Sequence, residues 1–322
     1  MQLKWIDFLL TFKCPSKCKH CSYRAGPDRT GFITLEEAEK WLTDLSKTQV
    51  LQAITVHGGE PFLYFRILKG ILKKAKELNI KERWVITNAY WAENEEIAEK
   101  KLIELKEAGL KCITFSVDAF HQEYIPIDKV KTGIEAATKI GFDKVAVDSY
   151  ILGGEDSNNE YNIMTRYAIS HVKDIKNIRL AKFPLDLEGR APDYLVDFLE
   201  PSIKIPDGKC QFPFWLEGDL KNPEGVEIDH EGNVTFCPGI CIGNAKDESL
   251  SDIIENYNYR NHPIIKVIAE EGPIGLIELA KERGYKEDQK FINECHLCYD
   301  MRRFLHPYFP EKLAPASCYS YG

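Results

Sequence analysis

Apolar and polar residues follow a repeating pattern through the first 185 or so residues of the chain. Apolar runs predict strands at 5–12, 50–57, 83–87, 111–117, 144–152 and 178–183. Between them, apolar residues recur at helical spacing in segments 34–46, 62–78, 93–108, 130–140 and 159–171. Strands that alternate with helices of this length form parallel βαβ units, so the pattern predicts an α/β fold.

The last third of the chain departs from this alternation. Pro, Gly and Cys become frequent, and six of the ten cysteines lie there. Residues 226–236 predict a hairpin that turns at Glu231-Gly232, and residues 250–290 predict a mostly helical segment that caps the site. We therefore expect two domains, residues 1–195 and residues 196–322.

Composition narrows the class of protein. The 322 residues carry 42 Lys plus Arg against 50 Asp plus Glu, a net charge of −8, which disfavours nonspecific binding to nucleic acid or to an anionic membrane. The amino terminus lacks the shape of a signal peptide, and no apolar run approaches bilayer length. Ten cysteines without an export signal favour metal or redox chemistry over disulfides. We expect a cytoplasmic protein with neither nucleic acid nor membrane as a partner.

Three cysteines directly after the first predicted strand are the strongest chemical signal. Cys14, Cys18 and Cys21 follow the spacing C-x3-C-x2-C on one tight loop. A [4Fe–4S] cluster held by four cysteines is coordinatively full, so three close thiolates leave one iron open for a substrate or cofactor. Zinc, with His20 or a distant cysteine as fourth ligand, is the alternative.

A second motif ends the second predicted strand. Gly58-Gly59-Glu60-Pro61 supplies glycines that let the backbone approach a ligand and a carboxylate that can accept from an ammonium group. Alone this segment is typical of an ordinary turn. Together with the cysteine loop it resembles the radical S-adenosylmethionine (radical SAM) superfamily. The resemblance implies a partial (β/α)6 barrel, with Gly58 to Pro61 receiving the amino group of S-adenosylmethionine.

The resemblance also implies roles for polar residues at other strand ends. Ser116, Asp118 and Ser149 are the candidates for holding the ribose and the methionine carboxylate of the cofactor. Two further candidates are Asn88, after the third strand, and Arg190, whose Gly189-Arg190-Ala191 segment resembles one found in relatives with an extra cluster domain. Each of these residues taken alone is also typical of a polar loop, and Cys112 fits an ordinary buried position.

The cysteines of the last third resemble the twitch domain, a shortened SPASM domain that carries one auxiliary [4Fe–4S] cluster. The implied ligands are Cys210, Cys237, Cys295 and Cys298. Cys210 stands rather far before Cys237, so Cys241 is the alternative fourth ligand, and zinc is the alternative metal. Residues 299–317 contain no cysteine, so we do not expect a second auxiliary cluster.

The implied activity is reductive cleavage of S-adenosylmethionine to a 5′-deoxyadenosyl radical, with reduced flavodoxin or ferredoxin as the electron donor. That radical abstracts a hydrogen atom from a substrate C–H bond. The segments 88–91 and 118–121 resemble the corresponding segments of enzymes that epimerise ribosomally made peptides. We therefore expect epimerisation or crosslinking of a peptide. The candidate catalytic thiol is that of Cys241, with Cys318 as the second choice. Nothing before the first strand could form a leader-binding domain, so oxidation or rearrangement of a small metabolite is the alternative, and a noncatalytic iron–sulfur or zinc protein is a third reading.

Overall fold

Six parallel strands, each followed by a helix or a polar loop, form the first half of the structure. The computed structural model describes residues 1–210, 218–286 and 290–320. The six strands are β1 (Trp5–Thr11), β2 (Ala53–Gly58), β3 (Glu82–Thr87), β4 (Cys112–Ser116), β5 (Lys144–Ile151) and β6 (Arg179–Pro184). They pair in parallel in their order along the chain. The predicted α/β fold is confirmed, and every predicted strand overlaps an observed one.

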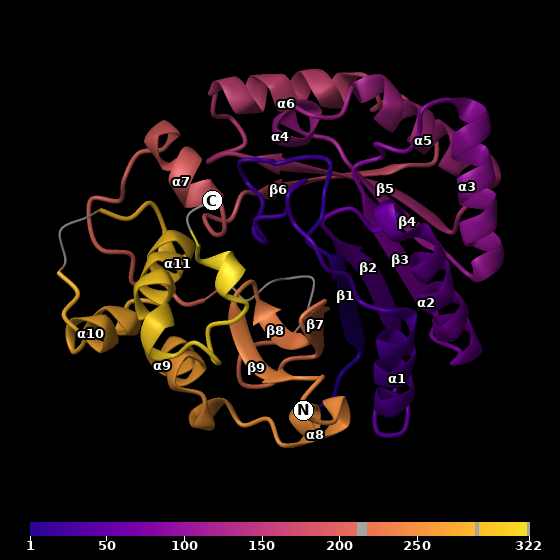
Figure 1. Cartoon of the computed structure of the whole chain (residues 1–322). Coiled ribbons are helices and arrows are strands. Elements are labelled where there is room, and N and C mark those ends of the chain that lie inside the picture. The colour runs from indigo at the N-terminus through magenta and orange to yellow at the C-terminus, as the bar shows by residue number, and fades with distance from the viewer. Residues whose placement is uncertain (211–217, 287–289, 321–322) are drawn as a thin grey trace.

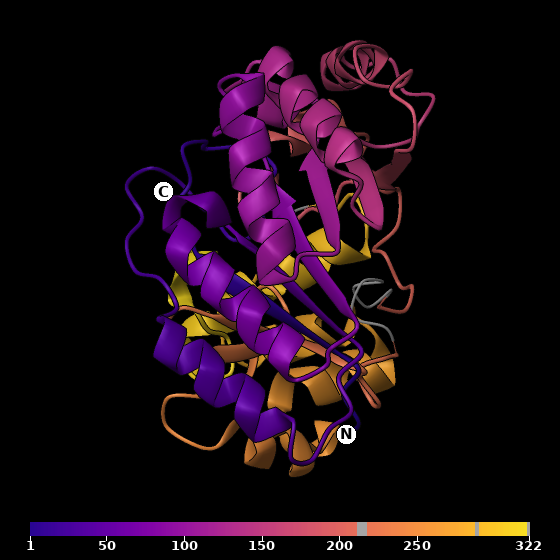
Figure 2. The same ribbon diagram turned by 90° about the vertical axis from the view of Figure 1, so that its right-hand side faces the viewer.

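The connecting helices cover the outer face of this curved sheet. The principal helices are α1 (Leu35–Leu45), α2 (Phe65–Glu77), α3 (Glu95–Ala108), α5 (Ile127–Ile140) and α6 (Glu160–Ser170). Short helices are η1 (Pro61–Tyr64), α4 (Ala119–Gln122), α7 (Ala191–Tyr194) and η2 (Val196–Phe198). Helices α1, α2, α3 and α5 pack side by side along the strands, at the right of the sheet in Figure 1 and in front of it in Figure 2. This one-sided helical layer leaves the inner face of the sheet to the functional residues.

One predicted helix is divided. The segment 62–78 forms η1 and then α2, because Glu60 caps η1 with its side chain and Pro61 occupies the first turn. The predicted first helix is confirmed, including the reciprocal hydrogen bonds between Thr34 and Glu37 of its capping box.

The C-terminal segment extends the sheet of the barrel. It contributes β7 (Gly225–Asp229), β8 (Asn233–Cys237) and β9 (Ile240–Asn244), and the described strands form one sheet in the order β6-β5-β4-β3-β2-β1-β7-β8-β9. The predicted hairpin is confirmed, with Gly232 at φ +90° in its turn. The parallel pairing of β7 with β1 was not predicted. The division at residue 195 stays a prediction, since the sheet continues across it.

Helices complete the C-terminal segment. They are α8 (Leu250–Glu255), η4 (Tyr259–Asn261), α9 (Pro263–Glu271), α10 (Gly275–Lys281), α11 (Glu294–Leu305), η5 (His306–Tyr308) and η6 (Ala316–Cys318). The mostly helical character predicted for 250–290 is confirmed among the described residues. Within that part of the chain, no helix has both the length and the apolar character needed to cross a bilayer.

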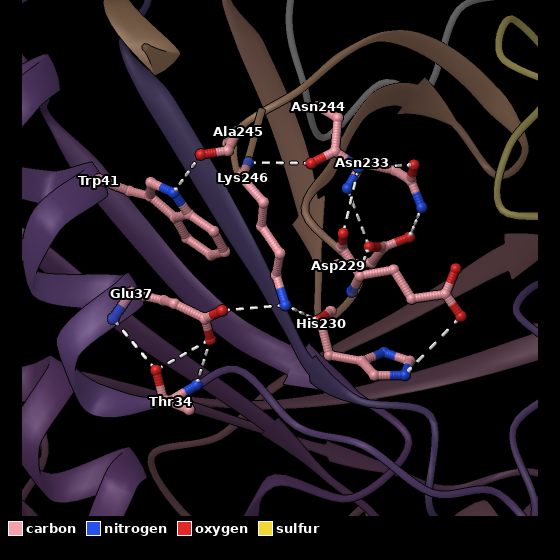
Figure 3. A network of polar contacts seen from close by, with 10 residues as sticks. Thr34, Glu37, Trp41, Asp229, His230, Asn233, Asn244, Ala245 and Lys246 are labelled. Carbon is pink, nitrogen blue, oxygen red and sulfur yellow. Dashed lines mark hydrogen bonds and ion pairs between the residues drawn. The ribbon is translucent and has the colours of Figure 1, made fainter. Parts of the chain in front are cut away.

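The C-terminal hairpin is fastened to α1 by a polar network drawn in Figure 3. The indole Nε1 of Trp41 donates to the carbonyl of Ala245 at 3.1 Å, and Lys246 Nζ pairs with Glu37 Oε1 at 2.9 Å. The Trp41 ring also stacks on Phe8 of β1 with 6.4 Å between ring centroids. Trp41 therefore joins the helix, the first strand and the C-terminal segment.

Trp41→Ala is expected to lower the free energy of unfolding by about 3–5 kcal/mol, because it empties a buried site and removes the donor to Ala245. Lys246→Ala is the matched control, with an expected loss below about 1 kcal/mol, because its ion pair is partly exposed. Anaerobic thermal denaturation measures both. Equal losses for the two variants would contradict this account of the interface.

Candidate active site

The cysteine loop is held in place by backbone hydrogen bonds rather than by regular secondary structure. Cys14 N donates to Gly26 O, and Gly26 N donates to Phe12 O, each at 3.0 Å, which closes the loop at its base. Within the loop, Ser16 N donates to Cys14 Sγ and Ala25 N to Cys21 Sγ, each at 3.4 Å. Amide donors of this kind stabilise thiolates, so the loop is suited to metal-bound cysteines.

The two glycines Gly58 and Gly59, at the carboxyl end of β2, lie directly against the end of β1. Gly59 N donates to Thr11 O at 2.6 Å, and Glu60 N donates to Lys13 O at 3.0 Å. A Cβ atom on Gly59 would clash with Lys13 O, and Gly58 has φ +118°. The close neighbour of these glycines is therefore the backbone that leads into the cysteine loop.

The Glu60 carboxylate joins two strand ends to the same loop. It is fully buried and accepts from Phe62 N at 3.1 Å, from Thr87 Oγ1 at 2.9 and 3.0 Å and from Asn88 N at 2.9 Å. Asn88 Nδ2 in turn lies 3.5 Å from Cys14 Sγ. Burial raises the pKa of Glu60 to about 7. Its predicted contact with the cofactor's amino group stays a proposal, as do those of Gly58, Gly59, Pro61 and Asn88.

Gly189 and Arg190 support the loop from the other side. Arg190 Nε donates to Cys18 O at 2.9 Å, and Arg190 Nη2 donates to Ala25 O at 2.5 Å. A Cβ atom on Gly189 would clash with Cys21 O, and its φ is +58°. Both donors of Arg190 bond carbonyl groups of the cysteine loop, so the Gly189-Arg190-Ala191 segment picked out from the sequence contains a residue that positions this loop. Its predicted contact with a carboxylate remains untested.

The predicted residues after β4 and β5 lie close together. Asp118 is fully buried, caps α4 through Phe120 N and His121 N at 3.0 Å, and pairs with His121 Nδ1 at 2.9 Å. Burial alone would raise the pKa of Asp118, but the charge and hydrogen bond of His121 lower it to about 2. The Ser149 hydroxyl donates to the main-chain carbonyl of Val117 at 2.5 Å. Ser116 is half-buried at the end of β4.

A cavity of about 130 Å³ opens beside the cysteine loop. Its lining includes His20, Cys21, Tyr23, Tyr150 and Asp186. The His20 ring centroid lies 5.2 Å from that of Tyr150, and burial lowers the pKa of His20 to about 3, so this ring is neutral. Sequence reasoning missed Tyr23, Tyr150 and Asp186 as site residues, although Tyr150 stands near the end of a predicted strand.

Four cysteines of the C-terminal segment gather at a second site. Cys237 and Cys295 each lie within the electrostatic influence of both Cys298 and Cys210. Cys295 and Cys298 share the first turns of α11, where side chains three residues apart are neighbours. Cys241 is placed elsewhere: its thiol donates to the carbonyl of Gly243 at 3.1 Å within the hairpin. This grouping supports Cys210 over Cys241 as the fourth auxiliary ligand.

Charged residues missed by sequence reasoning surround these cysteines. The Cys237 thiol donates to Glu188 Oε2 at 3.2 Å, and Arg302 Nη2 lies 3.6 Å from the same oxygen. Asp186 hydrogen-bonds with Cys295. Arg302 follows Cys298 by four residues on one helix, so its place beside the cysteines could have been predicted from the sequence. No such spacing relates Glu188 to the cysteines.

The remaining cysteines are buried. Cys318 is 1 % exposed, and its carbonyl accepts from Tyr299 Oη at 2.6 Å and from Arg24 Nε at 3.3 Å. Burial raises the pKa of its thiol well above the ordinary value, and Glu188 adds to that rise. Cys112 is buried in β4, as predicted.

The donor sets fit iron–sulfur clusters better than single ions. Two groups of metal-binding side chains in the described residues bring their donor atoms within 4.8 Å of one another, and neither contains a cysteine. Four thiolates around one zinc ion would lie about 3.8 Å apart, given Zn–S bonds of about 2.3 Å. Burial, with the charge of Glu60, raises the pKa of Cys14 to about 12, so this thiol needs a bound metal centre, of either kind, to become a thiolate.

Comparisons with known proteins agree with this geometry. The model of the radical SAM superfamily matches residues 8–167, and that of an iron–sulfur cluster-binding domain, SPASM, matches residues 223–299. The chain belongs to the radical SAM superfamily. The protein is therefore an enzyme that uses S-adenosylmethionine and a [4Fe–4S] cluster, and it carries an auxiliary iron–sulfur domain.

Individual relatives differ in how much of the chain they match. YydG of Bacillus subtilis (strain 168), provisionally named a peptide biosynthesis protein, is 22% identical over 311 residues, which are 92% of each chain. GTP 3',8-cyclase of Aquifex aeolicus is 31% identical over 165 residues, 47% of this chain and 49% of that protein. The structure of Streptococcus suis SuiB bound to precursor peptide SuiA has a TM-score of 0.57 at 16% identity, covering 92% of this chain and 76% of that one.

Gly189→Ala is expected to reduce the iron bound by the cysteine loop, because the added methyl group clashes with the carbonyls of Cys21 and Ser22. Gly154→Ala is the matched control, since a Cβ atom there would meet no described atom within 4 Å. Iron and sulfide are counted in both after anaerobic reconstitution. Full iron in Gly189→Ala would show that the segment is not needed to shape the loop.

Proposed function

We propose that this radical SAM enzyme modifies a peptide, by epimerising one of its residues. The observation that carries the proposal is the extent of the similarity to YydG, which spans both the barrel and the C-terminal segment. The GTP cyclases match only about half of the chain. A relative that shares both parts is the better guide to substrate class, since the match includes the segment with the auxiliary cysteines as well as the barrel.

The residues of the two sites divide the work. Cys14, Cys18 and Cys21 would hold the catalytic cluster, and Cys210, Cys237, Cys295 and Cys298 the auxiliary one. When bound, the catalytic cluster and S-adenosylmethionine supply a 5′-deoxyadenosyl radical that removes a hydrogen atom from a C–H bond. Ser116, Asp118, Ser149 and the segment Gly58 to Pro61 would orient the cofactor, with Asn88 beside the first cysteine and Arg190 behind the loop. Reduced flavodoxin or ferredoxin is the proposed electron donor.

An epimerase needs a second group that returns a hydrogen atom to the opposite face of the α-carbon. Sequence reasoning placed Cys241 first and Cys318 second. The surroundings now favour Cys318, because its carbonyl accepts from Arg24 of the cysteine loop and its thiol is buried, with a pKa raised first by burial and then by the charges of Asp229 and Glu188. The thiol would donate a hydrogen atom and be restored by one electron from the donor protein and one proton.

The alternative of a small-metabolite substrate stays open. The cavity beside the loop, about 130 Å³, is small, and it is lined by residues of the cysteine loop, by Gly58 and by residues of the segments around β5 and β6. Activity with a peptide but not with free amino acids would favour the proposal.

Cleavage of S-adenosylmethionine is the first test. The reconstituted, dithionite-reduced protein is expected to form 5′-deoxyadenosine, and the Cys14/Cys18/Cys21→Ala variant none, because it lacks the open iron. Chromatography with mass detection measures the product. A fully loaded wild-type protein that leaves S-adenosylmethionine intact would refute the enzyme assignment, whatever its substrate.

The thiol is tested by co-producing the enzyme with peptides encoded beside its gene and repeating the reaction in D2O. Wild type and Cys241→Ala are expected to give a D-residue with deuterium at its α-carbon, measured after acid hydrolysis by chiral chromatography. Cys318→Ala is expected to form 5′-deoxyadenosine without the D-residue. A labelled D-residue from Cys318→Ala at the wild-type rate would assign the hydrogen donor elsewhere.

A further inference from the structure

Three side chains of types that can bind metal ions meet on the inner face of the sheet, outside both cysteine sites. Asp7 of β1, His57 of β2 and Glu227 of β7 bring one donor atom each within 4.8 Å of one another. Phe8 stacks on Trp41 of α1, so its strand neighbour Asp7 points to the opposite, inner face. Glu227 stands directly opposite Asp7 in the parallel pairing, and His57 stands opposite the next inner residue of β1.

The group is buried and incompletely satisfied. Asp7 is 5 % exposed, and its Oδ1 atom has no hydrogen-bond partner among the described residues. The buried Nε2 atom of His57 also has none within that part of the chain. Burial raises the pKa of Asp7 to about 7, against the opposing effect of its hydrogen bonds with Thr55. Buried polar atoms without partners are costly, so these atoms call for a ligand.

The second such group in the described residues has a different explanation. His20, Asp118 and His121 also bring donor atoms together, but Asp118 accepts from two backbone amides and from His121. Asp118 thereby caps α4, and His20 lines the cavity beside the cysteine loop. The Asp7 group caps no helix of the described residues and keeps two buried polar atoms unpaired, against one, His20 Nδ1, in the other group.

We propose that Asp7, His57 and Glu227 bind a divalent metal ion of the zinc type. One imidazole nitrogen and two carboxylate oxygens are donors that Zn²⁺ accepts at about 2.0–2.2 Å, and three protein ligands leave a further position for water or substrate. Donors within 4.8 Å need only a small inward movement to reach one ion. The residues come from three adjacent strands, so the ion ties the C-terminal β7 to the barrel.

Tyr23 connects this site to the catalytic cavity. Its hydroxyl donates to Glu227 Oε1, and its ring packs edge-on against His57 with 6.0 Å between centroids. Tyr23 itself lines the cavity beside the cysteine loop. The proposed ion therefore lies behind one residue of the cavity wall, and hydrogen bonds to ligating carboxylates are the usual support for such sites.

The test is the zinc content of the intact protein. Anaerobically reconstituted wild type is incubated with Zn²⁺, desalted and analysed for zinc, iron and sulfide. Wild type is expected to keep about one zinc per chain, and Asp7→Asn and His57→Gln to lose it, falling about tenfold or more, with iron and sulfide unchanged. Asp229→Asn is the matched control, because Asp229 is a buried carboxylate of the same strand as Glu227 that already accepts from Glu231 and Asn233.

Three outcomes would overturn the proposal. Wild type could retain no zinc, or His57→Gln could retain as much as wild type, which would place the metal on the cysteines. A loss of zinc in Asp229→Asn equal to that in His57→Gln would indicate a general effect of buried charge. Unchanged iron and sulfide show that a variant has folded, so a loss of zinc is then specific.

Discussion

The three cysteines of the amino-terminal site stand on a loop without regular secondary structure, and the rest of the site depends on how that loop is fixed. Three strand ends hold it. The end of β2 bonds the backbone at Thr11 and Lys13, the end of β3 reaches Cys14 through Asn88, and the segment after β6 reaches Cys18 through Arg190. Loops placed by a rigid scaffold in this way are where catalytic residues concentrate.

Buried carboxylates set the electrostatics of both sites. Burial raises the pKa of Glu60 and of Glu188 to about 7, from an ordinary value of 4.5. An acid whose pKa is raised by folding opposes the folded state increasingly as the pH rises from 4.5 towards 7. Both residues therefore lower the stability of the folded chain at neutral pH. The same reasoning applies to Asp7 in the barrel.

Much of the fold could be predicted from the sequence, because strand and helix periodicities are local. The cysteine loop and the Gly58–Gly59 segment were readable for the same reason. The pairing of β7 with β1 joins residues more than 200 positions apart, and no local sequence pattern predicts it. The group of Asp7, His57 and Glu227 depends on that pairing, so it could not be predicted from the sequence. Glu188 and Arg302 meet for a similar reason, since β6 and α11 are distant in the chain. The roles of the individual site residues stay predictions, since geometry alone does not assign them.

The proposed catalytic cluster on the cysteine loop would leave one iron open to S-adenosylmethionine. Electron paramagnetic resonance of the reduced protein, recorded before and after adding S-adenosylmethionine, reports on that iron. We expect one cluster signal to change in wild type, and the Cys14/Cys18/Cys21→Ala variant to keep only an auxiliary signal that does not respond. A wild-type spectrum that S-adenosylmethionine leaves unchanged, with both clusters present, would contradict it.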